Sequence, residues 1–165
     1  MKNISHTNKN YSLFYIQSGI LLFFSFWFFI AFLTNLFDLL NNLGLINQWK
    51  FSSGNYASLQ KVISIYSTPK IILTALFYSD ISAQLLSSIL FLVAFVQFLR
   101  KTNPWPYINV AFGISMALWA IFLIMEEIFI SYSYEATHIR LLILEIMALI
   151  FLHILPTENL NIRSD

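Results

Sequence analysis

The sequence contains no cysteine and few charged residues. The absence of cysteine excludes disulfide bonds, thiolate metal sites and cysteine-based catalysis, and it leaves the redox compartment undetermined. Charged residues make up 10% of the 165-residue chain, against about 25% in a typical soluble domain. The formal net charge is only +1. The chain therefore lacks the basic character of a nucleic-acid-binding domain, and nucleic acid is not an expected partner.

Glycine is also scarce, with four residues in the whole chain. The sequence contains neither of the glycine-rich motifs that cradle nucleotide phosphates, nor the G-x-S-x-G motif that carries a nucleophilic serine. It also has no internal repeat and no low-complexity segment. No cofactor is expected from these motifs.

Hydrophobic residues are abundant, at 58% of the chain, and the mean hydropathy is +0.71. This composition predicts a single transmembrane domain over residues 1–165. Each of four apolar segments approaches the ~20 residues that cross ~30 Å of hydrocarbon as a helix. Open strands are excluded because lipid offers no partner to unpaired backbone groups. The expected fold is all-α, with spans at about 13–39, 80–99, 107–131 and 137–155.

The connection between the first two spans, 41–79, is too long for a bare loop. Within it, the stretch NYASLQKVISIY (55–66) carries one apolar stripe at helical spacing. The stripe consists of Tyr56, Leu59, Val62, Ile63 and Tyr66. We therefore expect a short helix that lies on the membrane surface or caps the bundle. Thr68 and Pro69 then resemble the N-cap and first residue of the following helix.

Orientation is encoded most directly in the short loop between the second and third spans, which carries Arg100 and Lys101. Basic residues close to the membrane favour the cytoplasmic side. With four spans, both termini share that side. The content of Phe, Ile, Asn and Ser, with Lys favoured over Arg, is typical of an AT-rich bacterial genome. The expected location is therefore the bacterial cytoplasmic membrane, with both termini cytoplasmic.

Two adjacent glutamates, Glu126 and Glu127, lie in an apolar segment, although carboxylates are costly there. Glu127 continues a stripe of small residues at helical spacing. Small residues let membrane helices approach closely, so this stripe is expected to pack against a helix of this chain, of another membrane protein or of a second copy. The stripe includes Gly113, Ala117 and Ala120. Glu127 is level with Arg140 across the short hairpin, which predicts a structural ion pair.

Glu126 lies on a different stripe, with Ser115, Trp119 and Phe122. His138 and Glu145 share one face of the last span, since they are seven residues apart. Several polar residues near the ends of the first and second spans fall in the same half of the membrane. The predicted cluster consists of Asn35, Asp38, Asp80, Gln84, Glu126, His138 and Glu145.

This cluster is one-sided, which bears on function. A channel needs polar lining through the full thickness, and a transporter site is expected near the midplane. The leading hypothesis is a non-enzymatic accessory or interaction protein in which the cluster is structural. One alternative is a protein that uses the cluster to bind a ligand, lipid headgroup or cation. Another is a membrane enzyme that acts at the lipid interface.

Metal chemistry has weaker support. Glu135 and His138 match one half of a di-iron motif, which needs two such copies. His138, Glu126 and Glu145 could hold zinc across the hairpin, although a capping histidine fits the same pattern. The aromatic run FFSFWFF (23–29) is expected to be lipid-facing bulk.

Three short motifs stand far apart: NLFD at 35–38, SGNY at 53–56 and EEIF at 126–129. This layout resembles the small four-helix bacterial membrane proteins that are catalogued as predicted integral membrane proteins of unknown function. In those proteins such stretches end the first helix, open the extracytoplasmic region and lie late in the third helix. The sequence departs from the pattern at Gln84, where a glutamate is expected, and at Ile128, where an aromatic residue is expected. The resemblance implies the four-helix plan and no activity.

Overall fold

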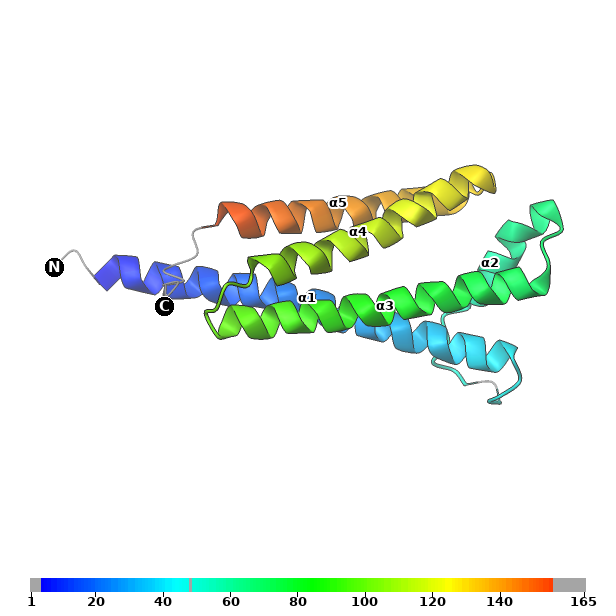
Figure 1. The fold of residues 1–165 in the computed structure, drawn as a ribbon, viewed down its shortest axis with the longest axis horizontal. Helices are drawn as coiled ribbons and strands as arrows, with labels where there is room; N and C mark the ends of the chain where they lie inside the picture. Colours follow the sequence, from blue (N-terminus) through cyan, green and yellow to red (C-terminus); the bar gives the residue numbers. More distant parts are fainter. Residues whose placement is uncertain (1–3, 48, 156–165) are drawn as a thin grey trace.

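The structure is a computed structural model, and it describes residues 4–47 and 49–155. Four long helices run up and down, so that the start of α1 and the end of α5 lie at the same end of the molecule (Figure 1). The short α2 lies at the opposite end. The helices are α1 (Ile4–Asn42), α2 (Asn55–Ile63), α3 (Lys70–Leu99), α4 (Trp105–Ile128) and α5 (Tyr132–Ile154), with a 3₁₀ turn, η1 (Ser64–Tyr66), after α2. The all-α prediction and the short helix between the first two spans are confirmed.

Four helices are long and apolar enough to cross a membrane: Ser12–Asn42, Lys70–Leu99, Trp105–Ile128 and Tyr132–Ile154. The second of them begins well before residue 80, where the predicted span began. Pro69 rather than Thr68 occupies its N-cap. The Thr68 hydroxyl instead donates to the carbonyl of Ile63, at 2.8 Å. Asp80 therefore lies within this helix, where its carboxylate accepts hydrogen bonds from Asn35 and Gln84.

Aromatic rings from three helices form the centre of the core. Phe24 of α1, Phe91 of α3 and Phe112 of α4 are almost fully buried. Their ring centroids are 4.9–5.3 Å apart. The aromatic run 23–29 is therefore only partly lipid-facing, which corrects the sequence expectation. Phe24 and Phe28 point into the core while Phe23 is exposed, because a helix turns adjacent residues about 100° apart.

Close packing of α1 against α3 is marked by two serines. The Ser25 hydroxyl donates to the carbonyl of Ser88 at 3.1 Å, and the Ser88 hydroxyl donates to the carbonyl of Ser25 at 3.0 Å. Such reciprocal bonds need backbones that approach closely, which small side chains permit in membrane helices. The helices α1 and α3 are therefore closely packed against each other.

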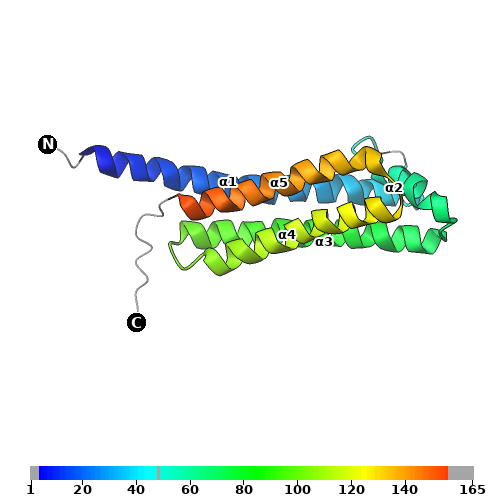
Figure 2. The same ribbon diagram turned by 90° about the horizontal axis from the view of Figure 1, so that it is seen from above.

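The last helix, α5, is packed differently. It runs alongside α4 (Figure 2). It makes few close contacts with α1. Its buried side chains are those of Glu145 and Leu152. Near the end of α5, the Gln17 side chain of α1 donates to the carbonyl of Leu152, at 3.4 Å. The seam between α1 and α5 is therefore a loose one, with few close contacts between the two helices.

Candidate functional site

The polar residues predicted to form one cluster fall into two groups in the structure. Four of them lie on α1 and α3, next to α2: Asn35, Asp38, Asp80 and Gln84. The other three lie on the α4–α5 hairpin: Glu126, His138 and Glu145. Among the residues that the structure describes, no hydrogen bond joins the two groups. The one-cluster prediction is corrected to two groups with different surroundings.

The first group is a closed amide–carboxylate network. The Asn35 amide donates to Gln84 Oε1 at 3.0 Å and to Asp80 Oδ2 at 3.3 Å. The Gln84 amide donates to Asp80 Oδ1 at 2.9 Å. The Asn55 amide of α2 donates to Asn35 Oδ1 at 2.9 Å. Each of these side chains forms a hydrogen bond with another member of the group. The network therefore connects α1, α2 and α3.

Asp38 extends this connection to the backbone of α2. The residue before α2, Gly54, has no side chain to cap the helix. Asp38 Oδ2 accepts instead from the backbone N–H of Tyr56, at 2.7 Å. The Ser52 and Ser53 hydroxyls donate to the same carboxylate, at 2.9 and 3.2 Å. A carboxylate near a helix N-terminus satisfies an otherwise unpaired donor and suits the helix dipole.

The apolar face of α2 completes this docking. Tyr56 and Ile63 are buried against α3, with the Tyr56 ring 5.3 Å from that of Phe77. The Tyr56 hydroxyl is 3.0 Å from that of Thr74. A helix of nine residues is marginal by itself in water. The first group therefore has a structural role: it holds α2 on the end of the bundle.

The second group contains a glutamate–histidine pair. Glu126 Oε1 lies 2.6 Å from His138 Nδ1. The imidazole ring stacks on Phe122, with centroids 4.8 Å apart, and on Trp119 at 5.9 Å. The second carboxylate oxygen of Glu126 is buried and has no hydrogen-bond partner among the described residues. This pair closes the α4–α5 hairpin near its turn.

The predicted ion pair between Glu127 and Arg140 is not formed. Both side chains are exposed, and no ion pair joins them in the part of the chain that the structure describes. Glu126 faces the bundle instead of Glu127. The orientation of α4 is set by Phe112 and Trp119, whose rings pack on those of α1 and α3.

The stripe of small residues on α4 consequently faces away from the other helices. Gly113 and Ala117 are exposed, and Ala120 is half-buried. A Cβ atom added at Gly113 would meet nothing within 4 Å. The bundle buries the stripe that contains Ser115, Trp119 and Glu126, so packing within this chain does not use the small residues.

Glu145 is the most deeply enclosed carboxylate of the hairpin, with 2% of its surface exposed. Its Oε1 accepts a hydrogen bond from the Trp119 indole N–H at 2.5 Å, and its Oε2 accepts one from the Ser115 hydroxyl. Both donors are neutral. The carboxylate is therefore oriented by α4, and no cationic side chain pairs with it among the described residues.

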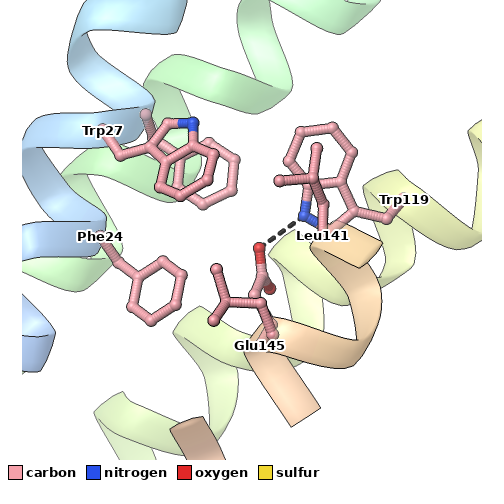
Figure 3. Close-up of a pocket in the computed structure, with 7 residues that line it drawn as sticks. Phe24, Trp27, Trp119, Leu141 and Glu145 are labelled. Atoms are coloured by element: carbon pink, nitrogen blue, oxygen red, sulfur yellow. Dashed lines mark hydrogen bonds between the residues drawn. The ribbon is translucent and has the colours of Figure 1, made fainter. Parts of the chain in front are cut away.

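A crevice between α1 and α5 reaches Glu145 (Figure 3). Phe24 and Trp27 stand on the α1 side, while Glu145 and Leu141 face them from α5 and Trp119 from α4. Phe28 and Leu144 complete the lining. The empty space there, open solvent included, is about 180 Å³, and the side chains leave almost no room for a water molecule. Glu145 therefore lies at the back of a narrow, mainly apolar and aromatic crevice.

Sequence reasoning missed several partners. Ser52, Ser53 and Asn55 bind the first group, yet they are far from Asn35 and Asp38 in sequence, and no local pattern predicts that they fold back onto α1. Ser115 and Trp119 could have been predicted as site residues, because they share the helical stripe of Glu126. That stripe is the buried one, and it orients Glu145 as well as Glu126.

Within the described ranges, no three His, Asp or Glu side chains lie close enough to hold a metal ion together. Comparisons of the chain with protein-family models, with curated proteins and with solved structures find no match.

Proposed function

We propose that the chain is a non-enzymatic accessory protein of the membrane that uses Glu145 to bind a ligand from the bilayer. The observation that carries this proposal is the position of Glu145 at the back of the α1–α5 crevice, held by two neutral donors. Ionisable residues inside membrane spans are costly and often mark a binding site. Asp38, which connects α1 to α2, accepts hydrogen bonds from four donors, whereas Glu145 accepts from two.

The reactivity of this carboxylate tests the proposal. The lipid-soluble reagent dicyclohexylcarbodiimide enters bilayers and modifies carboxyl groups that it can reach from the apolar phase. We expect it to modify Glu145 through the loose α1–α5 seam, and to spare Asp38, which is buried as deeply but surrounded by hydrogen-bond donors. Peptide mass spectrometry of the purified protein in lipid nanodiscs locates the adduct. An unmodified Glu145, or equal modification of Asp38, contradicts a ligand site at Glu145.

A second candidate function is association with another membrane protein or with a second copy through the small residues of α4. It is favoured by the exposure of Gly113 and Ala117 and by the open space at the Gly113 Cβ position. Replacing Gly113 with leucine should then reduce cross-linking between neighbouring chains or with a co-purifying protein. Gly19→Leu on α1, where the Cβ space is equally open, is the matched control. Equal cross-linking by both variants argues against this interface.

We also propose a place among the small four-helix bacterial membrane proteins, in the cytoplasmic membrane with both termini cytoplasmic. The motifs at 35–38, 53–56 and 126–129 support the resemblance, and the Arg100–Lys101 pair in the short α3–α4 loop supports the orientation. A cysteine at Asn103 should resist an impermeant thiol reagent added to intact cells, while one at Ser53 should react. The native chain has no cysteine, so the background is clean. Labelling at Asn103 with protection at Ser53 inverts the orientation.

A further inference from the structure

We infer that the ligand of the α1–α5 crevice is a lipophilic amine: a single-chain amphiphile with a protonated, monovalent ammonium head. It reaches Glu145 sideways from the hydrocarbon. This inference rests on the proposed ligand site and adds the chemical class of the ligand.

The charge of the site favours a cation. A carboxylate offers about four acceptor positions, and Glu145 uses one on each oxygen, for Trp119 and Ser115. No lysine, arginine or histidine forms an ion pair with it within the described residues. An ammonium group can donate to the remaining positions and neutralise the carboxylate charge. The pair then costs less free energy to bury in the low-dielectric membrane than either charge alone.

The lining of the crevice favours the same class. Phe24 and Trp27 of α1 stand opposite the carboxylate, and the Trp119 indole donates to it (Figure 3). Aromatic faces attract ammonium groups within about 6 Å of the ring centroid. Leu141 and Leu144 provide an apolar wall for methylene groups. An anionic or strongly hydrated ligand would find no complementary group on these surfaces.

The depth of Glu145 decides which amines fit. At 1.5 Å per residue, Glu145 lies roughly 20 Å along α5 from Tyr132 and roughly 14 Å from Ile154. This position is in the middle of the span, away from the level of phospholipid headgroups. A phospholipid amine is held at the interface by its phosphate, whereas a simple alkylamine carries no second polar group.

The size of the crevice and the packing of α5 limit the ligand further. The lining side chains leave almost no room for a water molecule, so the crevice is far from the ~300–1,000 Å³ pocket that encloses a drug-sized ligand. A ligand therefore enters only where α1 and α5 move apart, and a small head with part of one chain needs the least separation, with the rest of the chain in lipid. The few contacts between α1 and α5 let this seam widen for entry.

Dodecylamine is a suitable probe, with dodecanol as the neutral amphiphile of equal chain length. Binding of each is measured with the purified protein in nanodiscs, after subtracting partition into empty nanodiscs. We expect saturable binding of dodecylamine, protection of Glu145 from the carbodiimide, and neither effect with dodecanol. Glu145→Gln should weaken amine binding at least about tenfold. Glu127→Gln, at an exposed carboxylate on α4, should bind as the native chain does.

A second variant, Leu144→Trp, keeps Glu145 and its two donors but fills the crevice, and it should reduce binding similarly if Glu145→Gln does not fold. Equal saturable binding of dodecanol, or native binding by whichever of these two variants folds, overturns the inference. So does carbodiimide modification of Glu145 that dodecylamine does not reduce, although the proposed ligand site then still stands. If Glu145 is not modified at all, the ligand site itself fails.

Discussion

Replacing Asp38 with alanine is expected to release α2 from the end of the bundle. The carboxylate accepts from the Tyr56 N–H and from the Ser52 and Ser53 hydroxyls, and the variant leaves all three donors without it. Loss of a helix cap and of buried hydrogen bonds together costs about 2–4 kcal/mol. Hydrogen exchange of α2 amides should therefore accelerate roughly 30- to 1,000-fold, while the four long helices stay protected.

Two companion variants sharpen this result. Asp38→Asn keeps one acceptor oxygen and should give an intermediate effect. Asn41→Ala is the matched control, because among the described residues the Asn41 side chain bonds to the backbone of Trp49, at 3.0 and 3.1 Å, and has no hydrogen bond to α2. It should leave α2 exchange at the native rate. Native exchange in Asp38→Ala would show that the apolar contacts of Tyr56 and Ile63 hold α2 without the cap.

Removing both members of the Glu126–His138 pair should reveal a strong coupling. The two side chains are 2.6 Å apart and largely buried, so each alanine variant leaves a partner unsatisfied. A hydrogen bond to a charged group contributes about 1.5–3 kcal/mol. We expect a double-mutant cycle on thermal unfolding in detergent to return a coupling of about that size. The α4–α5 hairpin should loosen in each single variant.

The neighbouring pair, Glu127 and Arg140, provides the control cycle. Both side chains are exposed and do not form an ion pair. Their single alanine variants and their coupling should each stay within about 0.5 kcal/mol of zero. A large coupling for Glu127 and Arg140, with none for Glu126 and His138, would mean that α4 is rotated relative to the structure.

The sequence predicted which residues belong to the candidate site, but it did not predict which of them lie together. Glu126, His138 and Glu145 stand out because carboxylates and imidazoles are rare in apolar segments. Their partners are separated from them in sequence, as Ser115 is from Glu145, so no local pattern predicts these bonds. The separate role of Asp38 was equally hidden, because it depends on a turn that brings Ser52 and Tyr56 back to α1.

The sequence by itself determined the number and nature of the spans, since length and hydropathy suffice to predict a membrane helix. It also determined α2, whose apolar stripe at 55–66 indicates a helix with one buried face. Only the tertiary structure decided how α4 is turned. Lipid is as apolar as a leucine side chain, so hydrophobicity does not distinguish the face toward the bundle from the face toward the bilayer. Contacts from other helices make that choice: aromatic rings on Phe112, and the carboxylate of Glu145 on Ser115 and Trp119.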